Sequence, residues 1–136
     1  MSEESAGQFQ MPKHGEICWS ELSTTNVEGC KSFYSELFGW RYSGGDVPGM
    51  GYHEIHLGDG KQFGGIMQKA PELENVPSHW MSYVAVDDID ASLAKAAELG
   101  GAIIVPAMDI PNTGRFGVIS DPSGAVIAMI TLRVQG

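Results

Sequence analysis

The stretch SFYSELFGW, from Ser32 to Trp40, decides the fold, because it combines the end of an amphipathic helix with a clear stop signal. Apolar side chains recur at spacings of three and four residues over Val27–Leu37, which predicts a helix with one apolar face. Gly39 follows as the C-cap, where glycine adopts a left-handed backbone at little cost. Either Thr25 or Asn26 can serve as the N-cap. The expected apolar face consists of Val27, Cys30, Phe33, Tyr34 and Leu37.

Short strands are predicted on both sides of this helix. Alternation of apolar and polar side chains marks four segments: Glu16–Ser23 before the helix, then Trp40–Ser43, Tyr52–Leu57 and Phe63–Gln68 after it. Gly44–Gly51 is expected to be a turn region, and Asp59-Gly60 is a hairpin signal between the last two strands. The first half of the chain therefore predicts the order strand, helix, strand, strand, strand.

The same order begins again after a segment that contains two prolines and two glutamates. Trp80–Val86 predicts a strand, and Asp87 or Asp88 is expected to cap a helix that ends at Gly100-Gly101. Asp121-Pro122-Ser123-Gly124 is a strong turn signal. The apolar face of the helix should consist of Ile89, Leu93, Ala96, Ala97 and Leu99. Three strands are expected after it, at Ala102–Val105, Arg115–Ser120 and Ala125–Leu132, with Pro106–Asn112 predicted as a loop.

The repeated order predicts an α+β fold made of two βαβββ modules in one domain. The period is about 60 residues, judged from the two glycines that end the helices. We expect a disordered tail at residues 1–13, the first module at residues 14–69, a linker at residues 70–78 and the second module at residues 79–136.

The composition excludes several classes of partner. The chain has 136 residues and a net charge of −9, from 17 Asp and Glu against 8 Lys and Arg. Binding to nucleic acid or to an anionic membrane surface needs clustered basic side chains, so neither partner is expected. No stretch approaches the roughly 20 apolar residues of a membrane span, and the polar start lacks the features of a signal peptide, so the expected location is cytoplasmic. Cys18 and Cys30 form no zinc-binding pattern and are expected to be small buried side chains rather than a disulfide.

Four local motifs resemble the vicinal-oxygen-chelate superfamily, which includes glyoxalase I, bleomycin-resistance proteins and extradiol dioxygenases. They are the helix end within Ser32–Trp40, the helix opening Val86–Asp90, the helix end Leu99–Gly101 and the turn Asp121–Gly124. The resemblance lies nearest to the subgroup described as related to lactoylglutathione lyase. It implies that the paired βαβββ modules form a curled mixed sheet that makes a cup, and that two chains pair as a homodimer.

In metal-using members of this superfamily four ligands line the cup, and the resemblance places other side chains at those positions here. They are Trp19, Met67 or its neighbour Gln68, Met81 and Ala128. A divalent ion needs several imidazole or carboxylate ligands, which Trp and Ala do not supply, and a Met thioether suits only soft ions. No cofactor is therefore expected. A displaced divalent metal site that uses His56 or His79 stays open as an alternative.

The cup is expected instead to hold a small apolar or aromatic molecule. Side chains on a strand alternate between its faces, so Trp19 and Glu21 share one face of the first strand, and Met81 and Tyr83 share one face of the fifth. Glu21 and Tyr83 are the acid–base candidates. The ligand-binding candidates are Trp19, Glu21, Met67, Met81, Tyr83 and Ala128. Packing of the same side chains as a filled core is the alternative.

Two classes of function follow from this site. The first is a binding protein of the bleomycin-resistance type, which holds its small-molecule ligand without a metal. The second is a lyase, an isomerase or a dioxygenase-related enzyme that uses a displaced metal or metal-free acid–base groups, and a scaffold that has lost its site is a further alternative. Arg115 could pair with an anionic group of a ligand, or it could be a solvated strand charge.

Overall fold

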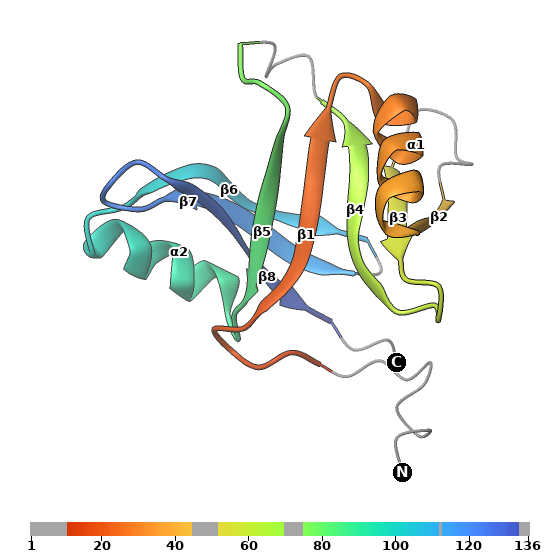
Figure 1. Ribbon diagram of the computed structural model, residues 1–136. Coiled ribbons are helices and arrows are strands. Elements are labelled where there is room, and N and C mark those ends of the chain that lie inside the picture. Colours follow the sequence, from red (N-terminus) through yellow and green to blue (C-terminus); the bar gives the residue numbers. More distant parts are fainter. Residues whose placement is uncertain (1–10, 45–51, 70–74, 112, 134–136) are drawn as a thin grey trace. The chain divides into compact units, whose positions relative to one another are not determined.

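The computed structural model describes residues 11–44, 52–69, 75–111 and 113–133 (Figure 1). Contacts divide the chain into two compact units: the first is Trp19–Trp80, and the second combines Met11–Cys18 with the chain from Met81 onward. Each unit has its own helix and its own buried core. Most of the expected tail, most of the expected turn region before residue 52 and the first part of the expected linker lie outside the described residues.

The first unit is a sheet with one helix packed on it. Its strands lie in the order β2, β3, β4, β1, with β1 parallel to β4 and the other pairs antiparallel. The elements are β1 (Ile17–Thr24), which enters this unit at Trp19, α1 (Val27–Phe38), β2 (Arg41–Gly44), β3 (Tyr52–His56) and β4 (Gln62–Gln68). The predicted helix and strands are confirmed, each to within one residue at either end.

Local capping fixes both ends of α1. Asn26 is the N-cap, and its side-chain oxygen accepts a hydrogen bond from the N–H of Gly29. Gly39 adopts the left-handed conformation, with φ of 77°, and its N–H donates to the carbonyl of Ser35. Of the two expected N-caps the structure therefore selects Asn26, and the expected C-cap is confirmed.

The core of the first unit lies between α1 and one face of the sheet. Three buried strand side chains and three side chains of α1 form it: Leu22, Ile55 and Ile66 with Val27, Cys30 and Tyr34. The prediction that Phe33 and Leu37 share this apolar face is wrong, because their side chains are 58% and 57% exposed. Phe33 points about 100° around the helix from its neighbour Tyr34, and Leu37 lies in the last turn of the helix.

The second unit repeats the arrangement. Its strands lie in the order β5, β8, β7, β6, with β5 parallel to β8 and the other pairs antiparallel. Asp88 is the N-cap of the helix, and its carboxylate accepts from the N–H of Ala91. The carboxylate of Asp121 accepts from the N–H of Ser123 and of Ala125, which fixes the predicted turn before the last strand. The elements are β5 (His79–Ala85), α2 (Ile89–Glu98), β6 (Ala102–Ile110), β7 (Gly114–Ser120) and β8 (Val126–Leu132).

The predicted loop Pro106–Asn112 is wrong over most of its length, since β6 continues to Ile110. The register of β6 against β7 shifts twice, between Ile103 and Val105 and between Val105 and Met108. Pro106 lies in the second shift, where the pairing does not use its missing N–H. Proline therefore bends this strand without ending it, which a single sequence does not distinguish from a loop.

The core of the second unit lies between α2 and its sheet. Ile89 and Leu93 of the helix are buried against Val86 and Met129. An ion-pair network also joins α2 to the sheet: Arg115 of β7 donates to the Asp90 carboxylate at 3.0 Å and to Asp109 of β6 at 3.2 Å.

The structure confirms the α+β fold class with two βαβββ repeats and mixed strand pairing. No helix among the described residues is long and apolar enough to cross a membrane. Cys18 and Cys30 are half-buried and are not joined to each other. Burial raises the pKa of the Cys18 thiol, and the nearby charge of Glu16 raises it further.

Candidate functional site

The face of the first unit's sheet that lies opposite α1 carries several polar side chains. Leu22, Ile55 and Ile66 point toward the helix, so their sequence neighbours point to the other, helix-free face. Strand pairing brings these neighbours together there, since Glu21 and Glu54 both pair with Gly65, and Tyr52 pairs with Met67. Sequence positions far apart thus form one surface. We call it the first helix-free face, and its members are Trp19, Glu21, Tyr52, Glu54, Gly65 and Met67.

A hydrogen-bonded chain of three side chains lies at the centre of this face. The indole N–H of Trp19 donates to the hydroxyl oxygen of Tyr52 at 2.9 Å. The same hydroxyl also forms a hydrogen bond with Glu21. This bond raises the pKa of the phenol, so the protonated Tyr52 hydroxyl donates to the Glu21 carboxylate. One hydroxyl group therefore accepts from Trp19 and donates to Glu21.

Gly65 provides the flat floor on which the Tyr52 ring lies. A β-carbon added at Gly65 would collide with the hydroxyl oxygen, Cζ and Cε1 of Tyr52. Any other residue at this position would push the ring away from the sheet, since the colliding atoms belong to a rigid ring. The glycine thus permits the close contact between ring and backbone.

The environment of Tyr52 disfavours the phenolate. Burial is the largest cause that raises the pKa of its phenol, and the negative charge of Glu21, the hydrogen bond to Glu21 and the charge of Glu54 raise it further. The hydrogen bond from Trp19 acts in the opposite direction, but the net change is a strong increase. Tyr52 is therefore a neutral hydrogen-bond donor and acceptor at physiological pH.

Glu54 has its own hydrogen-bond partners at the rim of the face. Its carboxylate accepts from the hydroxyl of Ser43 at 3.4 Å and from the side-chain amide of Gln62 at 3.2 Å. The charges of Glu21 and Glu54 both act on the Tyr52 hydroxyl, since each raises the pKa of its phenol.

The side chains of the first unit do not fit a family-type divalent metal. Trp19, at the position of the first family ligand, uses its nitrogen as a donor to Tyr52. The two alternative ligands, His79 and His56, have different surroundings. Nδ1 of His79 lies 2.9 Å from the carbonyl oxygen of Pro77. Nδ1 of His56 is buried without a hydrogen-bond partner among the described residues. Over the described ranges there is no group of three or more His, Cys, Asp or Glu side chains that could hold a metal ion.

The predicted ligand contacts of the second unit lie in a packed wall. Tyr83 of β5 pairs directly with Ala128 of β8, and their residues are 8% and 0% exposed. The Tyr83 ring lies 6.3 Å from that of Phe116, measured between ring centroids. Met81, two residues before Tyr83 on the same strand face, is only half-buried. The structure thus brings Tyr83 and Ala128 together as buried neighbours.

Arg115 is engaged by carboxylates of its own unit. The hydrogen bonds to Asp90 and Asp109 raise the pKa of its guanidinium further, and the guanidinium lowers the pKa of Asp90. Its donors are therefore directed to α2 and β6, and pairing with an anionic ligand group would have to replace these contacts.

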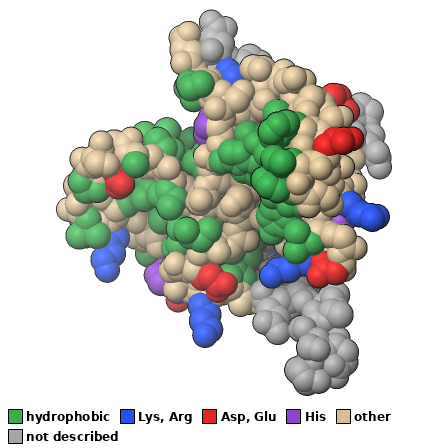
Figure 2. Space-filling model, in the orientation of Figure 1, with side chains coloured by type: hydrophobic (Ala, Val, Ile, Leu, Met, Phe, Trp, Pro, Cys, Tyr) green, Lys and Arg blue, Asp and Glu red, His purple; other side chains and the backbone are tan. Residues whose placement is uncertain are grey.

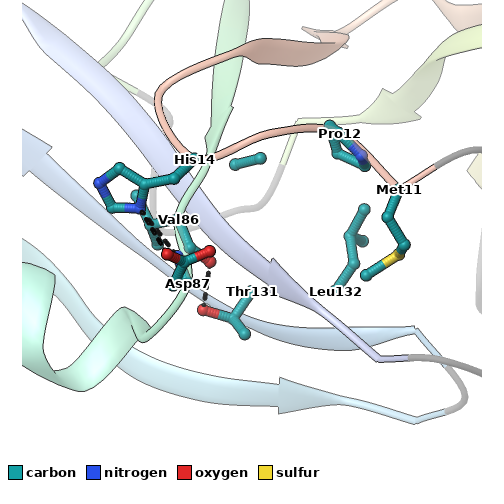
Figure 3. Close-up of a pocket in the computed structure, with 8 residues that line it drawn as sticks. Met11, Pro12, His14, Val86, Asp87, Thr131 and Leu132 are labelled. Carbon is teal, nitrogen blue, oxygen red and sulfur yellow. Dashed lines mark hydrogen bonds and ion pairs between the residues drawn. The ribbon is translucent and has the colours of Figure 1, made fainter.

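A small cavity of about 120 Å³ lies in the second unit, beside the segment before β1 (Figure 3). His14 Nδ1 accepts from the N–H of Asp87 at 3.0 Å, and the Thr131 hydroxyl donates to the Val86 carbonyl at 3.0 Å. Figure 3 shows these groups at one side and the side chains of Met11 and Leu132 at the other. These polar groups at the cavity already form hydrogen bonds with the protein, and the cavity would hold only a very small molecule.

Sequence reasoning missed Tyr52, which the structure places at the centre of the first helix-free face. The pattern showed only the first residue of a strand. One signal could have drawn attention to it: the paired glycines Gly64 and Gly65 in a strand, which indicate close approach of another group.

The comparisons with known proteins agree on one family. A family model of the Glyoxalase/Bleomycin resistance protein/Dioxygenase superfamily matches residues 17–129. CFP32 of Mycobacterium tuberculosis, which carries a provisional glyoxylase name, is 40% identical over 117 residues, which are 85% of this chain and 44% of that protein. The anthracycline biosynthesis protein DnrV of Streptomyces peucetius is 29% identical over 127 residues, which are 85% of this chain and 46% of that protein. The chain thus spans less than half the length of these curated relatives.

Solved structures share the fold at low sequence identity. The hypothetical protein BH1468 of Bacillus halodurans superposes with a TM-score of 0.68 at 12% identity, over 91% of this chain and 99% of its own. A methylmalonyl-CoA epimerase of Streptomyces coelicolor, solved in complex with 2-nitronate-propionyl-CoA, has a TM-score of 0.64 at 14% identity, over 90% of this chain and 100% of its own.

Proposed function

Since the chain belongs to the glyoxalase/bleomycin resistance protein/dioxygenase superfamily, we propose that it binds a small molecule with a flat apolar or aromatic body on the first helix-free face, without the family's metal. The observation that carries this proposal is the hydrogen-bonded chain of Trp19, Tyr52 and Glu21 over Gly65. It presents an aromatic surface and fixed polar groups together, which is the usual composition of a ligand site. Met67, paired with Tyr52, adds an adaptable apolar contact.

The proposed site rests on the first unit alone. Among the predicted ligand residues of the second unit, Tyr83 and Ala128 are buried and Met81 is half-buried. The name of DnrV gives independent support for an aromatic guest, because anthracyclines are flat fused-ring molecules.

Tryptophan fluorescence tests this proposal. The chain has three tryptophans, and titration with 2-naphthol and with naphthalene should quench the signal from Trp19. The Trp19→Phe variant should lose the quenching. Trp80→Phe is the matched control, because Trp80 donates to Tyr34 on the α1 side of the same unit and should leave the quenching unchanged. If neither 2-naphthol nor naphthalene quenches the fluorescence of Trp19, the proposal is wrong.

A lyase or isomerase is the second candidate, favoured by the carboxylate of Glu21 held in place by Tyr52. Glu21 would take a proton from a carbon next to a carbonyl and return one from solvent, as a positioned general base does. Exchange of the methyl protons of acetophenone in D2O tests this step. Wild-type protein should accelerate the exchange and Glu21→Gln should not, while Tyr83→Phe tests the other acid–base candidate. Equal rates with and without protein would exclude the enzyme.

We also propose that the chain forms a homodimer. Phe33, Leu37 and Phe38 of α1 are each more than half exposed, and hydrophobic side chains gather over this helix in Figure 2. A second copy is the proposed occupant, because an exposed apolar patch that is the same on both chains can pair with itself about a two-fold axis. Sedimentation at micromolar concentration should give a dimer, and Phe33→Ser should shift it toward monomer. A wild-type monomer would overturn this proposal.

A further inference from the structure

The arrangement around the Tyr52 hydroxyl has the form of a binding site with an occupant. Two fixed groups converge on one oxygen atom, with the Trp19 N–H donating to it and the Glu21 carboxylate accepting from it. The ring that carries this oxygen lies on the bare backbone of Gly65. We infer that this is a recognition site for an aryl hydroxyl, filled by Tyr52 in the free protein and taken over by the phenolic ring of a ligand when the Tyr52 side chain turns away. This inference rests on the proposed function and names its ligand class.

The donor and acceptor together select a hydroxyl group. An ether or a ketone can accept from Trp19 but has no proton for Glu21, and an ammonium group can donate to Glu21 but cannot accept from Trp19. A ligand carboxylate would be repelled, because the charges of Glu21 and Glu54 both act at this point. A neutral hydroxyl satisfies both partners, and leaving either one unpaired in a half-buried site is unfavourable.

The floor of the site selects a flat ring. Gly65 is buried, and the atoms that its missing β-carbon would strike are ring carbons and the hydroxyl oxygen. An aliphatic alcohol could make the same hydrogen bonds but would leave this flat surface in poor contact.

Tyr52 can leave the site without disturbing the sheet. It is the first residue of β3, and its pairing with Met67 is a backbone contact. Turning the side chain breaks the hydrogen bonds to Trp19 and Glu21, and the ligand hydroxyl forms the same two again. Because the hydrogen bonds lost and gained nearly cancel, the affinity would come mainly from contacts of the rest of the ligand. The apparent affinity would be lower than the intrinsic one, because only the fraction of protein with the Tyr52 side chain turned away can bind.

Removal of the Tyr52 ring exposes the site and tests the inference directly. Tyr52→Ala should bind 4-methylphenol about tenfold or more tightly than toluene, which has the same ring without the hydroxyl. The readout is the indole N–H resonance of Trp19 in a 15N-labelled protein. In the wild type, 4-methylphenol at high concentration should shift the same resonance by displacing Tyr52, and toluene should not.

A second pair of variants tests the floor. Adding Gly65→Ala to Tyr52→Ala should abolish the binding of 4-methylphenol, because the new β-carbon occupies the ring position. Gly58→Ala is the matched control in the same unit, since a β-carbon there meets nothing within 4 Å, and it should leave binding unchanged. Should Tyr52→Ala fail to fold, Tyr52→Phe keeps the ring. In that variant 4-methylphenol should still displace the ring and move the Trp19 resonance toward its wild-type position.

The outcomes separate this inference from the proposed function. Equal affinity of Tyr52→Ala for toluene and 4-methylphenol would overturn the aryl-hydroxyl inference and leave aromatic binding in place. Selective binding by Tyr52→Ala with no response of the wild type to 4-methylphenol would show a permanently filled position, which also overturns it. No Trp19 response of the wild type to any aromatic compound, 2-naphthol included, would remove the proposed function itself.

Discussion

The helix-free faces of the two units differ in chemistry although the units repeat the same order of elements. In the first unit, Trp19, Tyr52 and Glu21 form a half-buried hydrogen-bonded chain. In the second, Tyr83 pairs with a fully buried Ala128 in an apolar wall. The difference shows that one scaffold can carry a polar site in one repeat and ordinary packing in the other, so a function must be assigned to a particular repeat.

The helices differ in the same sense. α2 buries Ile89 and Leu93 in the core of its unit, whereas no residue of α1 is fully buried. α2 is also joined to its sheet by the Asp90–Arg115 ion pair. An ion pair of α1, between Lys31 and Glu28, lies within the helix itself. The second unit therefore depends on its helix for packing, and the first leaves part of its helix available.

Introduction of a carboxylate into the apolar wall should give the largest effect. Ala128→Glu places an unpaired charge in a fully buried position and should lower the free energy of unfolding by about 3–5 kcal/mol. Urea unfolding measures the change. Val126→Glu is the control on the same strand, because Val126 is 52% exposed, and its effect should stay below about 0.5 kcal/mol. A cost for Ala128→Glu as small as that of the control would mean that the wall is open to water.

Truncation of one leucine in each helix tests the second half of the comparison. Leu93→Ala removes a side chain that is 5% exposed and should cost about 3 kcal/mol in the free energy of unfolding. Leu37→Ala removes one that is 57% exposed and should cost about 0.5 kcal/mol or less in the monomer. Thermal or urea unfolding compares the two. Similar losses would contradict the contrast between the helices.

Removal of the Tyr52 hydroxyl should have an intermediate effect. Tyr52→Phe leaves the Trp19 N–H and the Glu21 carboxylate without their shared partner and should cost about 1–2 kcal/mol. The raised pKa of this phenol means that its contribution is fully present below the ordinary tyrosine pKa of about 10 and is lost as the pH rises through the raised value. Tyrosinate absorbance should therefore reach the same amplitude at about pH 11 in the wild type and in Tyr52→Phe. A clear loss of amplitude in the variant would show that Tyr52 ionises normally.

The ion pair of α2 should give the smallest effect, because the Asp90 carboxylate is exposed. The pKa of Asp90 is lowered chiefly by its hydrogen bonds with Arg115. Its contribution is present above the ordinary carboxyl pKa of about 4 and is lost as the pH falls through the lowered value. Asp90→Asn should therefore melt slightly below the wild type at neutral pH and low salt, and the gap should close in acid. A gap that persists at low pH would assign the effect to packing.

Local signals in the sequence were sufficient for most of the fold. Asn26, Gly39 and Asp88 act within one or two turns of the chain, and the structure places each at the helix end that it predicts. Pro106 shows the limit of such signals, because its fit within β6 depends on the register against β7. Phe33 shows another limit, since the helical period defines an apolar stripe but not how much of it the sheet covers.

The candidate site was less accessible to sequence reasoning. Alternation along β1 placed Trp19 and Glu21 on one face, and the observed pairing of Glu21 with Gly65 and Tyr52 with Met67 agrees with that placement. The role of Tyr52 depends on contacts between residues 33 positions apart and on a ring that lies over a glycine. Neither feature has a periodic pattern, so only the folded arrangement reveals it.

The two register shifts of β6 also bear on whether its edge could pair with other chains. β6 is the last strand in the order of the second unit's sheet, and Ile103, Ile104 and Met108 on it are exposed. A straight apolar edge of this kind is a template for pairing with other chains, and bulges and proline interrupt such templates. Pro106→Val would restore a backbone donor to the edge, and we expect the purified variant to form amyloid-like fibrils detectable by thioflavin fluorescence. We therefore expect the bend at Pro106 to protect this edge against aggregation.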